Sequence, residues 1–466
     1  MCGCGDAIID IMRAQIGSGW SVAASMGIAL VLAGCGVTSP DSDGTSTLPE
    51  TSTTALTETS TTLAESETTL IETTTSTVAG SNTVDPNVPP SLSRDDVPWP
   101  EVGDGWYVAL YDSSQVDPDG GGEIVEGPVV LFLVDSDGNR YEVSSWPAGD
   151  GPWWLTDAVG TTALVEGSGA TLDDFEWQVV DLLTGAATPV HTVSFPESAY
   201  SFGPVVALTR PTGANIVVYR SDGIDEWLER RSVDGTVLDV VYQQPYVDGV
   251  ESLRWMYGYD GTSLLVTHHG GIVEVSNTGE VLGENWVPPD HRCEPVRWWD
   301  ADTFLAVCYG QGPGSAPIDT DGNPHTYYGR LWLLETDGSA GTAMTEYPTE
   351  PPIVVDFGYH DAWPAGSETL IQWSGDCGSS QVATLQPDGM GVFIEIDVPM
   401  SIVADGVGMV DVLDEEVTIY GWEGCGGWIG TLFVTDLDGE HLRDLVPVVG
   451  DSLGVIGARG LATVYP

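Results

Sequence analysis

Two short segments of this 466-residue chain place carboxylates at alternate positions before a glycine. They are residues 135–139, Asp-Ser-Asp-Gly-Asn, and residues 319–323, Asp-Thr-Asp-Gly-Asn. Alternating oxygens around a tight turn can converge on a hard cation such as Ca²⁺. Neither segment has the distal Glu that completes such a loop, so a plain turn is the competing interpretation. The sequence therefore predicts no cofactor and leaves Ca²⁺ binding open.

Five other side chains are predicted to bind a ligand. Arg254 and Arg297 each precede a tryptophan in matching segments. Their guanidinium groups could receive an anion, or they could pair with the many acids of the chain. His325, Tyr327 and Tyr328 end a long loop and offer aromatic surfaces suited to a sugar or a peptide. Gly-x-Ser-x-Gly, His-Glu-x-x-His and glycine-rich phosphate-binding patterns are absent, so no catalytic residue and no metal ligand is predicted.

Four cysteines in the C-terminal part are predicted to form disulfides, as is usual in an exported chain. Cys293 and Cys308 lie symmetrically about a turn at residues 300–301, so antiparallel strands would place them opposite each other. Cys377 and Cys425 are 48 residues apart in similar glycine-containing loops and could join neighbouring units. A metal site is the alternative, but the chain has no Cys-x-x-Cys and no nearby His pair to support it.

The elements that must position these side chains are short β-strands. Apolar residues alternate or run in fours to sixes between Gly, Asp and Asn, without the helical period. A strand followed by a glycine-containing turn recurs seven times, with 44 to 59 residues between successive turn glycines. These strands are residues 129–133, 177–180, 228–233, 272–275, 331–334, 382–385 and 432–435.

A second strand precedes each of these, which leaves room for four strands in each period. The second strands are residues 107–111, 162–165, 216–219, 263–267, 304–308, 370–373 and 417–420. Four-stranded units of this length resemble the blades of a seven-bladed β-propeller, distantly WD40-like or TolB-like. Residues 453–465 could then close the ring against the first blade. The competing fold is a stack of β-sandwich domains, and the chain lacks the motifs of WD40 repeats and sialidases from which an activity could be inferred.

The N-terminus has the pattern of an export signal. Residues 21–34 form an apolar run too short to span a bilayer, and residues 32–35, Leu-Ala-Gly-Cys, resemble the lipobox of bacterial lipoproteins. That resemblance implies a signal peptide over residues 1–34 and a diacylated Cys35. A start at Met12 would give the signal the positive N-terminal region that residues 1–11 lack. The alternative is a buried apolar helix that happens to end in Cys.

A stalk and an acidic body follow the signal peptide. Residues 35–95 are rich in Thr, Ser and Glu and are predicted to be disordered, whereas residues 96–466 hold nearly all the Trp and Tyr and form the propeller. The whole chain has 70 Asp and Glu against 13 Arg and no Lys, and a net charge of −57. Such a surface repels nucleic acids and anionic lipid headgroups. This organisation resembles actinobacterial lipoproteins with a Thr-rich stalk and a propeller-like body.

The combined prediction is a monomeric lipoprotein, anchored by its lipid on the extracellular face of the bacterial cell membrane. Its propeller is predicted to be non-enzymatic and to bind or scaffold a protein or a cell-wall glycan. The ligand would meet the face that carries the long loops, residues 112–127 and 310–329. The alternatives are an extracytoplasmic hydrolase or lyase acting on carbohydrate with carboxylates from several blades, and a purely structural envelope component.

Overall fold

The computed structural model describes residues 85–116, 124–167, 176–190, 206–246, 253–268, 271–375, 379–399, 406–423 and 429–461. The predicted signal peptide, Cys35, almost all of the stalk, Cys377 and Cys425 lie outside these ranges. Within them the chain is all-β, apart from the 3₁₀ helices η1 (Arg94–Asp96) and η2 (Trp99–Glu101). In the same ranges, no helix is long and apolar enough to cross a membrane.

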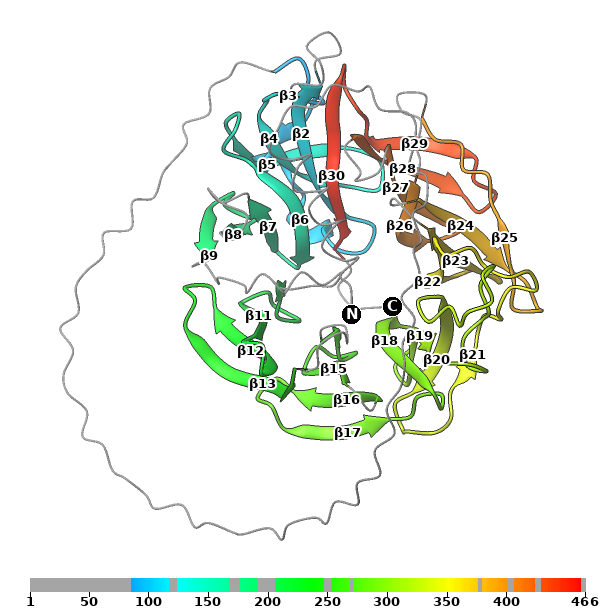
Figure 1. Cartoon of the computed structure of the whole chain (residues 1–466). Helices are drawn as coiled ribbons and strands as arrows, with labels where there is room; N and C mark the ends of the chain where they lie inside the picture. The colour runs from blue at the N-terminus through cyan, green and yellow to red at the C-terminus, as the bar shows by residue number, and fades with distance from the viewer. Residues whose placement is uncertain are drawn as a thin grey trace, which may run out of the picture. The chain divides into compact units, whose positions relative to one another are not determined.

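The sheets are four-stranded and antiparallel, and most consist of four strands that pair in chain order (Figure 1). Three of them are β6 (Pro152–Val159), β7 (Thr162–Gly167), β8 (Glu176–Asp181) and β9 (Ala187–Val190); β10 (Val206–Leu208), β11 (Asn215–Ser221), β12 (Asp225–Ser232) and β13 (Val237–Pro245); and β14 (Trp255–Tyr257), β15 (Ser263–His268), β16 (Gly271–Ser276) and β17 (Val281–Asn285). The next three are β18 (His291–Trp298), β19 (Thr303–Gly310), β20 (Gly329–Glu335) and β21 (Thr342–Ala343); β22 (Asp356–Ala365), β23 (Glu368–Gly375), β24 (Ser380–Leu385) and β25 (Gly391–Phe393); and β26 (Gly406–Leu413), β27 (Glu416–Glu423), β28 (Ile429–Asp436) and β29 (His441–Val446).

One further sheet joins the two ends of the described body. The C-terminal strand β30 (Ser452–Gly460) pairs with β2 (Tyr107–Val116), which pairs in turn with β4 (Val129–Val134), and β4 with β5 (Arg140–Trp146). Two-residue strands extend this sheet: β3 (Ile124–Val125) pairs with β2, and β1 (Leu92–Ser93) runs parallel to β5. The prediction that C-terminal residues pair with the first unit is thus confirmed.

The hairpin turns explain why glycine recurs with the repeat. All seven predicted turn glycines have φ between 72° and 89°, a left-handed conformation that side chains with a Cβ rarely adopt. They are Gly138, Gly185, Gly235, Gly279, Gly338, Gly389 and Gly439. Each lies between the third and fourth strands of its sheet. The predicted strands lie within observed ones, except that the strand predicted at residues 228–233 extends one residue past the end of β12 at Ser232. Local backbone geometry therefore fixes this part of the sequence pattern.

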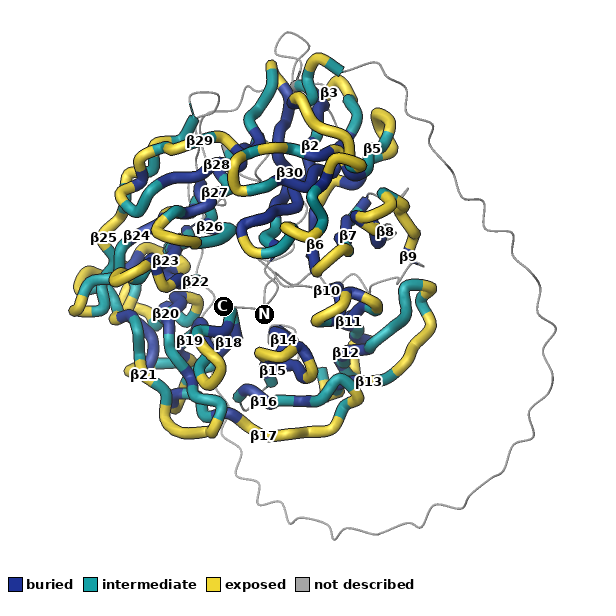
Figure 2. Tube along the Cα trace, turned by 180° about the vertical axis from the view of Figure 1, so that it is seen from behind, coloured by how far each residue is buried: buried dark blue, intermediate teal, exposed yellow. Residues whose placement is uncertain are grey.

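Apolar clusters between successive sheets hold the body together. One cluster packs Leu164 of β7 against Ile216 of β11, and similar clusters join each later pair of sheets. The last sheet packs against the first, where Leu432 of β28 belongs to one cluster with Phe132 of β4 and Val455 of β30. Figure 2 shows that buried residues concentrate in the inner strands and exposed ones in the outer strands and turns. Each sheet thus needs its neighbours to bury both of its faces.

Candidate functional site

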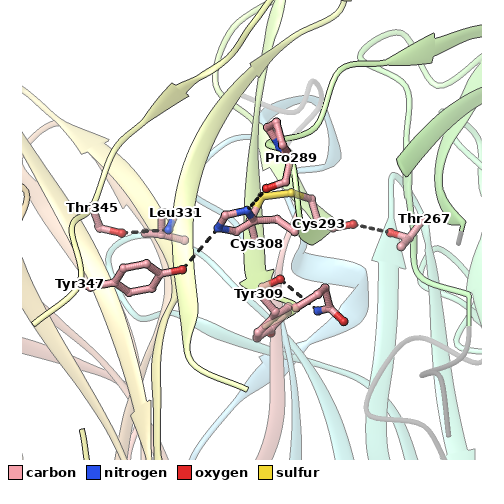
Figure 3. Close-up of a disulfide and its surroundings, with 10 residues drawn as sticks. Thr267, Pro289, Cys293, Cys308, Tyr309, Leu331, Thr345 and Tyr347 are labelled. Atoms are coloured by element: carbon pink, nitrogen blue, oxygen red, sulfur yellow. Dashed lines mark hydrogen bonds between the residues drawn. A yellow bond between two sulfur atoms is a disulfide. The ribbon is translucent and has the colours of Figure 1, made fainter. Parts of the chain in front are cut away.

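Cys293 and Cys308 form a disulfide across strands β18 and β19 (Figure 3). The two residues are directly opposite in the antiparallel register, with their Cα atoms 4.0 Å apart. The Thr267 hydroxyl of the preceding sheet donates a hydrogen bond to the Cys293 carbonyl at 3.1 Å. The structure therefore brings this predicted pair together at a contact between two sheets.

Replacing both Cys293 and Cys308 by Ala is expected to lower the free energy of unfolding by about 3 kcal/mol. The disulfide spans a sequence separation of 15 residues, and the chain-entropy model gives about that value for such a loop. The urea midpoints of the oxidised wild type and the double variant would measure the loss. Equal midpoints would show that the disulfide contributes nothing to stability.

Arg254 and Arg297 are both engaged by acids. Arg297 donates to Asp361 through Nε and Nη2, each at 2.7 Å, and its guanidinium carbon lies 3.2 Å from the centroid of the Trp363 ring. Arg254 Nε lies 3.6 Å from a carboxylate oxygen of Glu294. These four charged side chains are only 11–16% exposed. The structure thus favours pairing within the chain over the anion-binding alternative.

The sequence pattern did not reveal three aspartates that occupy the same place in the first, or inner, strands of their sheets. These strands are β6, β22 and β26. Asp157, Asp361 and Asp411 each follow a bulged residue, and each carboxylate accepts the N–H of the next residue at 2.8–2.9 Å. Asp157 also accepts two hydrogen bonds from the Arg210 guanidinium, at 2.8 and 2.9 Å. An Asp followed by a small apolar residue, repeated 50 residues apart at Asp361 and Asp411, is the signal that could have revealed them.

Asp411 differs from the other two because no arginine binds its carboxylate within the described part of the chain. Its second oxygen lies 3.5 Å from the hydroxyl of Tyr107, which itself accepts from the Thr418 hydroxyl at 2.8 Å. Burial raises the pKa of the Asp411 carboxyl above its ordinary value. All three inner-strand aspartates are therefore occupied by contacts that hold adjacent strands and sheets.

His325 and Tyr328 do not provide the exposed aromatic surfaces that the sequence suggested. They are 6% and 3% exposed, and their rings pack edge to face against each other. His325 Nε2 donates to the Ile353 carbonyl at 3.2 Å, and Tyr328 packs on Tyr347. They are buried because residues 347–357 cover the loop, which the sequence pattern did not indicate. Tyr327 is 65% exposed and remains available to a ligand.

The two Asp-rich segments use their carboxylates to stabilise their own turns. Asp135 Oδ1 accepts the N–H groups of Asp137 and Asn139, and Asp319 accepts those of two residues in its own segment in the same way, all at 2.8–3.0 Å. In the described ranges, no group of three or more His, Cys, Asp or Glu side chains is arranged to hold a metal ion. The turn interpretation accounts for both segments.

Exposed apolar side chains lie on the β19–β20 loop and on residues 353–357, two segments that hydrogen bonds join. We call this surface the loop patch, and its residues are Ile318 (46% exposed), Tyr327 (65%), Ile353 (56%), Val354 (58%), Val355 (40%) and Phe357 (40%). The two segments are joined by the His325 hydrogen bond and by the Thr320 N–H, which donates to the Pro352 carbonyl at 3.2 Å. These hydrogen bonds hold the two segments of the loop patch next to each other.

The surroundings of the loop patch are acidic. Asp319, Asp321, Glu350 and Asp356 lie within or next to its two segments. Arg330 is the only Lys or Arg between residues 311 and 375, and it is paired with Glu346 at 2.7 Å. The patch thus combines an apolar surface with a negative rim.

Comparisons with known proteins yield structural similarity only. No family model matches the chain, and neither does any curated protein. The β-propeller domain of the trilobed protease from Pyrococcus furiosus is 11% identical, with 74% of this chain and 95% of that one covered and a TM-score of 0.42. A protein from Lactobacillus plantarum is 14% identical, with coverages of 76% and 99% and a TM-score of 0.46. An oligogalacturonate lyase in complex with manganese is 15% identical, with coverages of 73% and 86% and a TM-score of 0.40. At these identities none of them assigns an activity to this chain.

Proposed function

We propose that this protein is a lipid-anchored binding module on the extracellular face of a bacterial membrane. In this proposal the lipid is attached to Cys35, residues 36–95 form a stalk, and the four-stranded sheets are the blades of one seven-bladed propeller. The lipobox-like sequence supports the anchor, and the pairing of β30 with β2 supports ring closure. The propeller binds a segment of another protein at the loop patch.

The loop patch is the observation that carries this proposal. Monomeric soluble proteins rarely expose large contiguous apolar surfaces, and those that exist are often interaction sites. Here six exposed apolar residues lie on two segments joined by hydrogen bonds, one of which is made by the buried His325. The inner-strand aspartates, by contrast, are engaged in contacts within the chain, which gives a carbohydrate hydrolase or lyase less support.

Charge indicates which kind of protein segment fits the patch. The chain has a net charge of −57 and no lysine, so a second copy of it or its own Glu-containing stalk would be repelled from the acidic rim. A segment with Lys or Arg between apolar residues would complement both the rim and the patch. Such complementarity speeds association and selects the partner.

Replacing Ile353 and Val354 together by Asp is expected to weaken binding at least about tenfold, or about 1.4 kcal/mol. The probe is a short capped peptide of Lys, Leu and Trp, measured by fluorescence anisotropy against the whole body. The added negative charge alone would strengthen binding of this cationic probe, so a loss reports the apolar contact. The double variant should unfold at the wild-type urea midpoint because both side chains are exposed.

The matched control replaces Val281 and Leu282 of β17, which are 59% and 53% exposed, by Asp. It should bind the peptide as the wild type does. A peptide in which Glu replaces Lys should not bind either variant or the wild type. Equal affinity of the two Asp variants for the Lys-containing peptide would contradict the proposed patch.

A further inference from the structure

Glu166 lies between two tryptophans on one face of the sheet β6–β9. It is directly opposite Trp154 on β6 and Trp177 on β8 in the antiparallel registers. Side chains in such a row share a face, with Cβ atoms about 4.5–5.5 Å apart. Trp154 is 37% exposed and Trp177 is 3% exposed, so the row runs from an accessible inner strand to the core between two sheets.

The Glu166 carboxylate is unusual because it has no partner within the described ranges. No hydrogen bond or ion pair from another described residue reaches it, whereas the buried acids Glu229 and Glu294 are paired with arginines. Burial alone raises the pKa of Glu166 to about 7. Burial of an unpaired carboxyl lowers the free energy of unfolding at neutral pH, because no hydrogen bond or ion pair compensates for its desolvation. Such destabilising groups are characteristic of functional sites.

The neighbouring sheet contributes other charged groups. Arg220, Glu229 and Arg231 lie on the face of that sheet that packs toward this one, because they share it with Ile216 and Val218 of the intervening cluster. Arg231 is paired with Glu229, and burial lowers the pKa of Arg220. None of these charges contributes to the raised pKa of Glu166, which has desolvation as its only cause.

We propose that Trp154, Glu166 and Trp177 form a binding site for an alkylammonium ion. An ammonium head would supply the charge pairing that Glu166 lacks in the described part of the chain, and indole rings attract such cations through their π faces. Trp154 forms the solvent-accessible side of the proposed site, and the buried Trp177 forms the opposite side. The strongly negative chain raises the local concentration of cations around it.

Ion binding at Glu166 is coupled to proton release, which gives the proposal a distinctive signature. The cation binds the ionised carboxylate, so the affinity should fall as protonation competes below a pKa of about 7. Between pH 8 and pH 6 the ionised fraction, and with it the association constant, is expected to fall about tenfold. A neutral sugar stacked on Trp154 would not require ionisation and would show no such dependence.

Tetramethylammonium is the probe, titrated into the body at constant ionic strength and followed by tryptophan fluorescence and calorimetry. The wild type should bind it with the pH dependence above, and Glu166→Gln should lose at least about tenfold in affinity together with the pH dependence. Trp154→Leu should weaken binding at every pH. Far-UV circular dichroism and urea midpoints establish that each variant is folded.

Asp411→Asn is the matched control because it removes another buried carboxyl with a raised pKa, on a different sheet. It should bind tetramethylammonium as the wild type does, and so should the double variant Ile353→Asp, Val354→Asp. Unchanged binding by Glu166→Gln, or no binding by the wild type at pH 8, would overturn the proposal. pH-independent binding of N-acetylglucosamine in place of the cation would also overturn it. These outcomes are independent of the peptide experiment on the loop patch.

Discussion

Truncation after Val449 is expected to unfold the body, although it removes only one regular element. That element is β30, which forms the inner edge of the first sheet through its pairing with β2. Its side chains Leu453, Val455 and Ile456 are at most 8% exposed. Ile456 belongs to the cluster shared with the sheet β6–β9, and Val455 belongs to the cluster shared with the sheet β26–β29. At about 1.5–3 kcal/mol for each buried side chain, their loss removes about 5–9 kcal/mol. That is comparable with the whole stability of a typical domain, about 5–15 kcal/mol.

Near-UV circular dichroism and urea unfolding of the truncated chain would measure this effect. A chain that ends after Leu461 keeps β30 and serves as the control, which should retain the wild-type midpoint. A synthetic peptide of residues 450–461, added to the truncated chain, should restore part of the native signal because it supplies the missing inner strand. Cooperative native-like unfolding of the truncated chain without the peptide would show that the stability of the body does not depend on the pairing of β30 with β2.

The strands and turns could be predicted because their causes are local. Period-two apolar segments define the strands, and the left-handed φ of each turn requires glycine, so both features recur with the repeat. The pairing of Cys293 with Cys308 followed from their equal spacing about one turn. Lipidation of Cys35 and the bonding of Cys377 and Cys425 remain predictions from the sequence.

The parts of the site that depend on contacts between sheets could not be predicted in this way. His325 and Tyr328 are buried by residues 347–357, a segment without a periodic pattern, and these residues also create the loop patch. The roles of Asp157 and Asp361 depend on strand bulges, which place each carboxylate against its own backbone and an arginine of a neighbouring sheet. Neither a bulge nor an arginine more than 50 residues away is visible in a local pattern.

Arg297→Met is expected to lower the free energy of unfolding by about 3–5 kcal/mol, which is the usual result of breaking a buried ion pair from one side. Arg297 and Asp361 are 16% and 15% exposed, so the Asp361 carboxylate would be left buried without its bidentate partner. The contact of the guanidinium with Trp363 would be lost as well. Adding Asp361→Asn should recover much of the loss because it removes the uncompensated charge, and urea midpoints of the single and double variants would give the coupling.

Arg443→Met supplies the comparison that separates burial from charge. Arg443 also binds a carboxylate, that of Glu416, but these side chains are 30% and 41% exposed. Solvent and salt screen such a pair, so its loss should lower the free energy of unfolding by less than about 1 kcal/mol and by even less at high salt. The effect of Arg297→Met should change little with salt. If the two variants lose equal free energy of unfolding, the buried pair of Arg297 and Asp361 contributes no more to stability than an exposed pair does. The ion pair would then not be what holds the adjacent sheets together.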